Sequence, residues 1–305
     1  MINPADGGID AVILNFSPTS LNILNGVLAV VMFSIAIDLK LGDFTKLARA
    51  PKPLLTGLFS QFVLLPALTF CLILATNPQP SIALGLILVA ACPGGNISNF
   101  ITHTARGNAA LSVSMTGFAT VGAIVLTPLN IAFWGSLYGP TREILRQTSV
   151  DPVAVAITVG FMLVLPLCLG VALNHKRPDI TDRLRGKLRL VSMGIFVAFV
   201  AVALAANWAL FLEFAGAVAV LVFLHNALAL GGGFALASVM GLSDADRRAV
   251  TIETGIQNSG LGLILIFGFF NGLGGMAVVA AFWGMWHIIS GIALAGVMAR
   301  RQPAL

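Results

Sequence analysis

The chain has 305 residues, of which 58% are hydrophobic and only 10% charged, with a mean hydropathy of +0.96. A soluble domain carries about a quarter charged residues, so this composition excludes a soluble globular protein and indicates an all-α polytopic membrane protein. The net charge is +5, but the basic residues lie in loops between apolar segments. Membrane orientation explains them better than nucleic acid does, and no nucleic-acid partner is expected.

Nine membrane spans are predicted from apolar runs of about 20 residues that are separated by charged residues, prolines and glycines. They lie near residues 21–39, 55–75, 81–104, 109–134, 152–174, 190–208, 213–240, 249–270 and 276–299. The remaining segments are an N-terminal stretch (1–20), a connection between the fourth and fifth spans (135–151) and a tail (300–305).

The basic residues predict the orientation of these spans. Of the 17 Lys and Arg residues, 15 fall on one side of the membrane, and only Arg142 and Arg146 fall on the other. Because loops rich in Lys and Arg stay in the cytoplasm, the N-terminus is predicted outside and the C-terminus inside. The expected location is a cell membrane, such as a bacterial inner membrane.

The third predicted span is interrupted by "CPGGNISN", residues 92–99. Pro93 removes a backbone donor and clashes with the preceding turn, and the two glycines after it lower the cost of unwinding. Irregular backbone at membrane depth is tolerated only where protein buries it or where it lines a watery cavity. We therefore predict two half-helices, 81–92 and about 97–104, the second with its N–H groups forming an anion site. A simple proline kink is the alternative.

The eighth predicted span contains "TIETGIQNSGLG", residues 251–262. Glu253 is the only acidic residue in the interior of any predicted span, since Asp38 and Glu213 lie at span ends. Burying its charge costs about 2.5–3.5 kcal/mol on insertion scales. Gln257 lies four residues later on the same helical face, and unwinding near Gly255 would release the carbonyls of Thr254 and Ile256. Carboxylate, amide and carbonyl oxygens suit a hard cation, and sodium is expected to share that preference.

The two interrupted spans run in opposite directions through the membrane. Such a pair indicates inverted repeats with a transport site between them. The first repeat is predicted at 21–134 with four helices, and the second at 152–299 with five. The first repeat thus lacks its opening helix.

These segments resemble the bile acid:sodium symporter family over nearly the whole chain. The resemblance is carried by "QFVLLP" (61–66), "CPGGNISNFITHTARGNAALSVSMT" (92–116), "LHN" (224–226), "TIETGIQNSGLG" (251–262) and "WHIISG" (286–291). It implies a core domain, in which two discontinuous helices cross near mid-membrane, packed on a smaller panel domain. The nine predicted spans match the shorter form of this family, whose other members have ten helices.

The resemblance also implies two sodium sites that share one carboxylate. Residues matching the first site are Ser98, Asn99, Ser112, Thr116 and Glu253, and those matching the second are Gln61, Glu253, Thr254, Ile256 and Gln257. Ser112 and Thr116 lie four residues apart, hence on one helical face. Either residue alone would more often bond its own helix backbone, and Gln61 could instead satisfy a carbonyl freed by Pro66.

A substrate anion is expected beside the crossing, because half-helix N-termini attract carboxylates and sulfonates. The candidate contacts are Asn96, Ile97, Asn258 and His287. The usual His-Asn pair of the family is replaced here by His287-Ile288, which removes an amide and leaves the substrate open. His225 and Asn226 are expected to form hydrogen bonds between helices.

The predicted function is sodium-coupled symport of an organic anion, bile-acid-like or a smaller carboxylate, by alternating access. Na⁺ is the expected coupling ion, and no organic cofactor, other metal or catalytic residue is expected. Arsenite efflux on a related fold, with Cys92 as a membrane thiol, is one alternative, and a passive channel is another. An intramembrane hydrolase using Glu253 and His287 is a third alternative, although the sequence lacks a nucleophile–base motif.

Overall fold

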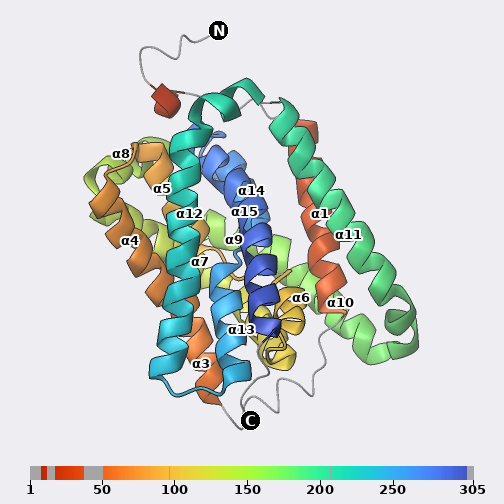
Figure 1. The fold of residues 1–305 in the computed structure, drawn as a ribbon. Helices are drawn as coiled ribbons and strands as arrows, with labels where there is room; N and C mark the ends of the chain where they lie inside the picture. The colour runs from red at the N-terminus through yellow and green to blue at the C-terminus, as the bar shows by residue number, and fades with distance from the viewer. Residues whose placement is uncertain (1–7, 12–17, 38–50, 96, 207, 301–305) are drawn as a thin grey trace.

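A computed structural model describes residues 8–11, 18–37, 51–95, 97–206 and 208–300 of the chain (Figure 1). Within these ranges the backbone is helical apart from short connections and one isolated β-bridge. The elements in chain order are the 3-10 turn η2 (Gly8–Ala11), α1 (Pro18–Ala36), α3 (Pro51–Phe59), the π-helical turn η3 (Ser60–Leu64), α4 (Leu65–Thr76), α5 (Pro80–Ala91), α6 (Ile97–Thr104), α7 (Ala109–Leu137), α8 (Gly139–Thr148), α9 (Pro152–Val159), the π-helical turn η4 (Gly160–Val164), α10 (Leu165–Lys176), α11 (Pro178–Ala206), α12 (Trp208–Val239), α13 (Asp244–Gly255), α14 (Ser259–Phe269) and α15 (Gly274–Ala299).

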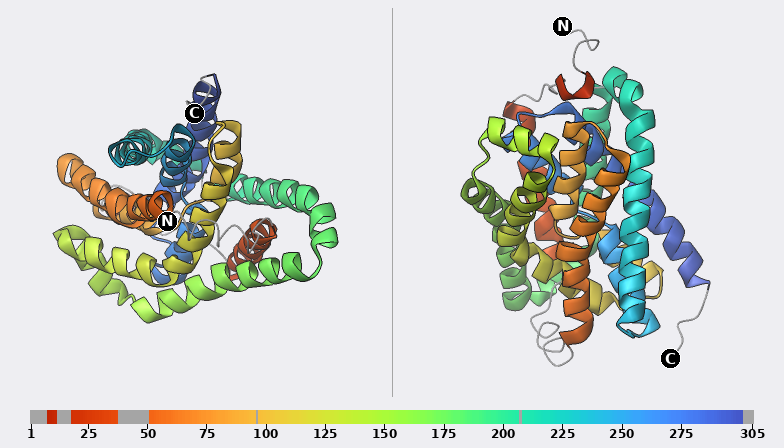
Figure 2. Two further views of the ribbon diagram at one scale, coloured as in Figure 1. Left: turned by 90° about the horizontal axis from the view of Figure 1, so that it is seen from below. Right: turned by 90° about the vertical axis from the view of Figure 1, so that its left-hand side faces the viewer.

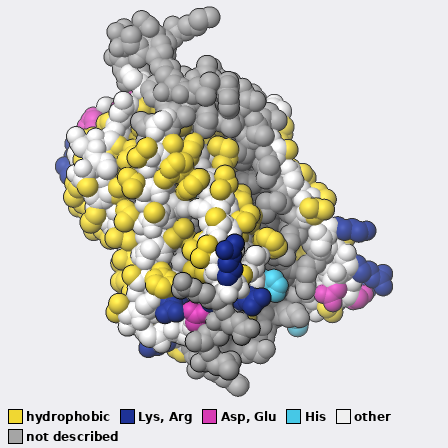
Figure 3. Space-filling view, in the orientation of Figure 1, with side chains coloured by type: hydrophobic (Ala, Val, Ile, Leu, Met, Phe, Trp, Pro, Cys, Tyr) yellow, Lys and Arg dark blue, Asp and Glu magenta, His cyan; other side chains and the backbone are white. Residues whose placement is uncertain are grey.

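The outer surface is suited to lipid. On α7, the residues Val121, Val125, Leu129 and Phe133 follow one another at four-residue spacing and are each between 50% and 58% exposed. Figure 3 shows hydrophobic side chains over the middle of one face, with most charged side chains toward its lower end and its edges. A soluble monomer rarely exposes contiguous apolar surface of this kind, so the protein is a helical membrane protein.

Five helical segments of the described chain are long and apolar enough to cross a bilayer. They are Pro51–Thr76, Ala109–Leu137, Pro152–Lys176, Val218–Val239 and Gly274–Ala299, and each coincides with a predicted span. The predicted spans 81–104 and 249–270 are each built from two shorter helices. Those at 21–39 and 190–208 extend into residues outside the described ranges, so the total of nine stays a prediction.

Two segments predicted as connections contain helix. The connection 135–151 includes α8, and the buried Thr141 hydroxyl at its start donates to the carbonyl of Gly135 at the end of α7 (2.7 Å). The basic stretch before the sixth predicted span belongs to α11, which already begins at Pro178. Arg, Lys and Leu are good helix formers, so this helix is longer than its apolar part.

Prolines inside two spans are accommodated by π-helical turns. Pro66 has no N–H group and would clash with the carbonyl four residues before it. The turn η3 widens the helix just ahead of it, and the N–H of Leu65 bonds to the carbonyl of Ser60. The turn η4 precedes Pro166 in the same way. Such turns are frequent at functional sites, and η3 carries Gln61.

The helices form a small group beside a larger one. In Figures 1 and 2, α1, α10 and α11 stand together on one side of the molecule. In the larger group, α5 and α14 are central, since Ser81–Ala91 and Ser259–Ile266 are buried at every residue. A helix that is apolar all round belongs in a core. The grouping is compatible with the predicted panel and core domains, which remain a prediction.

Candidate functional site

Both predicted interruptions are present in the structure. The helix α5 ends at Ala91 and α6 begins at Ile97, within one residue of the predicted half-helices. In the second segment, α13 ends at Gly255 and α14 begins at Ser259. The alternative of a simple proline kink is therefore wrong, because a kinked helix would continue on both sides of Pro93.

The two interruptions lie against each other and run antiparallel where they meet. The N–H of Gly95 donates to the carbonyl of Ile256 (2.6 Å), and the N–H of Asn258 donates to the carbonyl of Pro93 (2.9 Å). Backbone groups freed at membrane depth need partners within the protein. The two unwound segments supply them to each other, which holds the half-helices at one crossing.

Side chains from neighbouring helices cap the carbonyl ends of the first half-helices. The Thr127 hydroxyl donates to the carbonyl of Ala91 (2.7 Å), and the Asn226 amide donates to the carbonyl of Gly255 (2.8 Å). The predicted interhelical role of Asn226 is confirmed. Thr127 was not predicted, and its only sequence signal is a hydroxyl beside Pro128 in an otherwise apolar stretch.

The residues that match the first sodium site come together around the side-chain carboxylate of Glu253. Its Oε2 atom accepts hydrogen bonds from Ser98 Oγ (2.6 Å) and Ser112 Oγ (2.9 Å), and its Oε1 atom accepts one from Thr116 Oγ1 (2.6 Å). We call this set, all of it buried, the Glu253 cluster: Ser98, Asn99, Ser112, Thr116 and Glu253. Three helices, α6, α7 and α13, contribute to it.

The Glu253 cluster holds more acceptors than protons. Ser112 Oγ lies 2.8 Å from Asn99 Oδ1 and 2.9 Å from Glu253 Oε2, yet a hydroxyl has one proton to donate. Thr116 Oγ1 faces three acceptors, Asn99 Oδ1 (3.3 Å), the Ser112 carbonyl (3.0 Å) and Glu253 Oε1 (2.6 Å). Oxygen lone pairs therefore face one another in a buried site, which is unfavourable. A small cation would remove this conflict.

The negative charge of the cluster also favours a bound cation. Glu253 is 1% exposed, and a buried charge is stable only when it is paired. Among the described residues, no Lys or Arg forms an ion pair with it, and the two arginines on the same helix, Arg247 and Arg248, pair with Asp244 instead. The atoms that the cluster offers as ligands are hydroxyl oxygens, an amide oxygen and the carboxylate oxygens of Glu253. Such a set suits a hard cation such as Na⁺.

Next to the crossing lies a second buried group, which we call the Gln61 cluster: Gln61, Thr254 and Gln257. The Gln61 amide donates to Gln257 Oε1 (2.7 Å) and to the carbonyl of Cys92 (3.1 Å), and the Gln257 amide donates to the carbonyl of Thr254 (2.8 Å). Gln61 thus does not serve a carbonyl freed by Pro66, and that alternative is wrong. Its Oε1 atom is buried without a partner, which costs about 1–3 kcal/mol. The Oε1 atom of Gln61 is therefore available as a ligand for a cation.

Two further residues that match the second sodium site, Glu253 and Ile256, have their hydrogen-bond partners outside the Gln61 cluster. The carbonyl of Ile256 already accepts the N–H of Gly95. Within the described residues, every hydrogen bond of the Glu253 side chain goes to the Glu253 cluster. Sharing of this carboxylate between two sites therefore stays a prediction. Thr254 Oγ1 bonds to Ser60 Oγ (2.9 Å), a residue that the sequence did not single out.

Of the predicted substrate contacts, Ile97 and Asn258 lie at the two interruptions, at the starts of α6 and α14. Asn258 caps α14 by accepting the N–H of Leu261 (3.0 Å), while its Nδ2 group is buried without a partner. His287 is buried, and its Nδ1 atom has no partner either. Ile97 is half-buried at the start of α6, and Asn96 lies outside the described residues. Asn258 and His287 thus retain polar atoms that a ligand could satisfy.

Comparison with known proteins identifies relatives of this chain. A protein of Bacillus subtilis (strain 168), "Uncharacterized sodium-dependent transporter YocS", is 32% identical over 268 residues, covering 88% of this chain and 80% of that protein. "Probable sodium/metabolite cotransporter BASS1, chloroplastic" of Arabidopsis thaliana is 31% identical, covering 90% of this chain and 66% of that protein. A "Sodium-dependent organic anion transporter" of Bos taurus is 25% identical, covering 84% and 71%.

The family resemblance noted in the sequence is confirmed by these relatives and by a direct match. Residues 26–214 match the sequence profile described as "Sodium Bile acid symporter family". The relatives that share this sequence bear the names of sodium-dependent transporters and cotransporters. The chain is therefore a member of the sodium bile acid symporter family.

Proposed function

We propose that this protein is a secondary active transporter that couples the entry of Na⁺ to the uptake of an organic anion by alternating access. Family membership makes it a sodium-dependent transporter of the membrane. The observation that carries the finer proposal is the Glu253 cluster, in which three hydroxyls and an amide oxygen surround a buried carboxylate. Sodium is a co-substrate in this proposal, and no other cofactor takes part.

Each group of residues has a distinct role. The Glu253 cluster holds one sodium ion, and the Gln61 cluster holds a second with the help of the unpartnered Gln61 oxygen. The organic anion binds next to the crossing, where Asn258 and His287 keep free polar atoms and the start of α14 presents its positive end. Asn96 and Ile97 complete this proposed substrate site.

Coupling follows from the helices that contribute to the clusters. A cation in the Glu253 cluster ties α6 and α13 together at the crossing, which is also the wall of the proposed anion site. Two ligands that stabilise one arrangement raise each other's affinity. We infer that the group of α1, α10 and α11 and the larger group then move relative to each other, exposing the site to either side.

The organisation in the membrane belongs to the same proposal. The repeats comprise residues 21–134 and 152–299 and are joined by 135–151, which lies outside the cell with the segment 1–20. The tail at 300–305 is cytoplasmic, and the protein resides in the cell membrane. The uneven distribution of Lys and Arg between the loops supports this orientation.

Reconstitution of the purified full chain into liposomes tests the proposal. Labelled bile acid, pantoate and a 2-keto acid are offered under an inward sodium gradient, and separately under an equal potassium gradient. We expect one of these anions to accumulate intact, and only with sodium. Uptake that ignores the sodium gradient would indicate a passive channel, and chemical change of the anion would indicate an enzyme.

The Gln61 cluster is tested by Gln61→Leu, which keeps the side-chain volume and removes the amide. We expect the sodium concentration for half-maximal uptake to rise about tenfold, because one polar ligand contributes on the order of 1.5 kcal/mol. The Hill coefficient for sodium should fall to one, because the Glu253 cluster remains. An unchanged sodium dependence would contradict a cation site at Gln61.

The arsenite alternative is tested by Cys92→Ala. The Cys92 thiol is fully buried in apolar surroundings, and no bond from it to either cluster is present among the described residues. We expect uptake to remain sodium-driven and stability to fall by about 1 kcal/mol, the cost of a small cavity. Loss of all transport with an intact fold would instead favour a thiol-dependent mechanism. Folding is checked by size-exclusion chromatography.

A further inference from the structure

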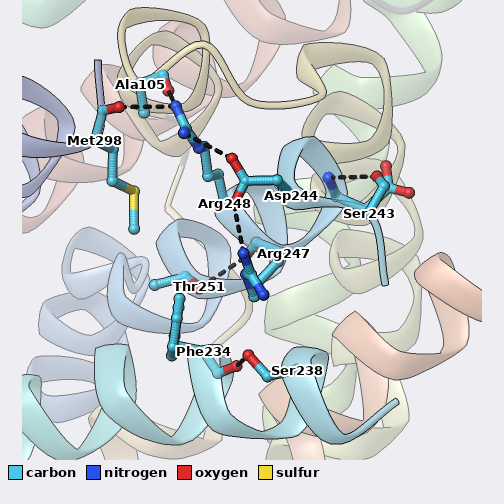
Figure 4. Close-up of polar contacts among 10 residues, drawn as sticks. Ala105, Phe234, Ser238, Ser243, Asp244, Arg247, Arg248, Thr251 and Met298 are labelled. Carbon is cyan, nitrogen blue, oxygen red and sulfur yellow. Dashed lines mark hydrogen bonds and ion pairs between the residues drawn. The ribbon is translucent and has the colours of Figure 1, made fainter. Parts of the chain in front are cut away.

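A second polar network lies away from the crossing, where α13 begins (Figure 1), and Figure 4 shows its contacts around Arg248. Its centre is Arg248, which is only 5% exposed. The Nη1 group donates to the carbonyl of Ala105 (2.7 Å), just after α6, and to the carbonyl of Met298 (2.9 Å), near the end of α15. The Nη2 group pairs with Asp244 Oδ2 (2.7 Å) in the first turn of its own helix. One side chain thus joins three helices.

A neighbouring contact adds a fourth helix. The side-chain amide of Asn108 donates to Asp246 Oδ1 (2.7 Å), and its backbone N–H donates to the carbonyl of Ala245 (2.9 Å). The same residue caps α7, because its Oδ1 atom accepts the N–H of Leu111 (3.1 Å). We call the set Asn108, Asp244, Asp246 and Arg248 the polar clasp.

The packing around the polar clasp leaves little room for movement. A Cβ atom at Gly107 would lie 2.9 Å from Thr102 Cγ2, 3.1 Å from Arg248 Cβ and 3.3 Å from the carbonyl oxygen of Ala245. Contacts below 3.4 Å are tighter than ordinary van der Waals packing. The turn between α6 and α7 is therefore pressed directly onto the start of α13.

The polar clasp joins the three helices that build the Glu253 cluster, α6, α7 and α13, and ties them to α15. Along α13, Arg248 precedes Glu253 by five residues, a rise of about 7.5 Å, and along α7, Asn108 precedes Ser112 by four residues, about 6 Å. Over such short distances a helix behaves as a rigid rod. The relative position of α6, α7 and α13 at the polar clasp thus sets the spacing of their oxygens at the cluster.

We infer that Arg248 is a positioning residue for sodium binding: through the polar clasp it holds the Glu253 carboxylate at the distance from Ser98, Ser112 and Thr116 that Na⁺ requires. The inference rests on the proposed sodium-coupled function. Arg248 is not a ligand of the ion.

The chemistry of the side chain explains why an arginine lies here. A guanidinium presents five N–H donors in a planar fork, which reaches two carbonyls and a carboxylate at once, whereas an ammonium group cannot span them. Burial raises the pKa of Asp244, but the hydrogen bond from Arg247 and the charge of Arg248 outweigh it and hold that pKa below its usual value. Asp244 therefore stays negative at neutral pH and compensates the buried guanidinium.

Sodium titrations of thermal unfolding test the inference on the purified full chain, with potassium keeping the ionic strength constant. For Arg248→Met we expect the half-maximal sodium concentration to rise about tenfold, equivalent to about 1.4 kcal/mol. For Arg248→Lys we expect a rise of about threefold, because one of the bridging contacts can be kept. The same shifts should appear in the sodium dependence of uptake.

Arg247→Met is the matched control. Arg247 lies next in the chain, pairs with the same Asp244 and packs over the ring of Phe234, but among the described residues it forms no bond to α6, α7 or α15. We expect its half-maximal sodium concentration to match that of the wild type. A purely structural role for Arg248 would lower the unfolding temperature in potassium and leave the sodium dependence unchanged.

Asn108→Ser provides an independent variant if Arg248→Met cannot be purified. Serine still caps α7 but loses the donor to Asp246, so the half-maximal sodium concentration should again rise. If the wild type responds to sodium and both Arg248→Lys and Asn108→Ser respond at the wild-type concentration, the inference is overturned and the proposed function stands. A wild type without any sodium response overturns both.

Discussion

Glu253→Gln abolishes the sodium response: neither sodium-driven uptake nor sodium-dependent thermal stabilisation should remain. Glutamine keeps the shape of the side chain but removes the negative charge that the hydroxyls of Ser98, Ser112 and Thr116 surround. We expect the sodium affinity to fall by at least about 100-fold, equivalent to about 2.7 kcal/mol. Uptake and unfolding are measured in sodium and in potassium.

The stability of this variant in potassium provides a second readout. In the absence of a bound cation, Glu253 is a buried charge among competing acceptors, and a neutral amide adds donors where protons are lacking. The unfolding temperature of Glu253→Gln in potassium should therefore equal or exceed that of the wild type. Glu143→Gln on the exposed face of α8 is the control. Sodium stabilisation that persists in Glu253→Gln would refute the cation site.

Gly95→Ala separates the two interruptions and should eliminate transport. A Cβ atom at this position would lie 2.6 Å from the carbonyl oxygen of Gln257, and real Cβ contacts are essentially never shorter than 3.0 Å. Because the opposing atom belongs to the backbone, relief requires α13 and α14 to move away. Such overpacking typically costs about 1–3 kcal/mol, and here it also breaks the bond from the Gly95 N–H to Ile256.

The measurements for Gly95→Ala are the unfolding temperature, sodium stabilisation and uptake. A matched control is Gly268→Ala on α14, where an added Cβ meets nothing within 4 Å. Since alanine favours a helix by about 1 kcal/mol over glycine, the control should be as stable as the wild type or more so. Wild-type uptake by Gly95→Ala would show that close contact between the interruptions is not needed for transport.

Much of the site could be predicted from the sequence because its signals are local. A proline followed by two glycines disrupts a helix wherever it occurs, and the break at residues 92–96 follows from that alone. A single carboxylate in an apolar stretch requires compensation, which singled out Glu253. The limits of α11 were predicted less well, because hydropathy ends at the membrane surface while helix propensity continues.

The contacts between distant segments required the tertiary structure. Gln61 and Gln257 are 196 residues apart, and no local pattern indicates that the amide of one serves the other. The capping hydroxyl of Thr127, the bond from Thr254 to Ser60 and the bridging guanidinium of Arg248 are of the same kind. Each looks like an ordinary helix residue until the fold supplies its partner.

The amino-acid sequence by itself thus determined that the chain crosses a membrane as helices, where two of them break and which carboxylate is buried. These properties depend on the transfer of short segments into lipid and on the covalent limits of proline and glycine. Only the tertiary structure decided which oxygens face Glu253, which atom of Gln61 is left without a partner and how α6, α7 and α13 are held together. The reason is that hydrogen bonds act over about 3 Å, so they are defined only once packing has brought distant helices together.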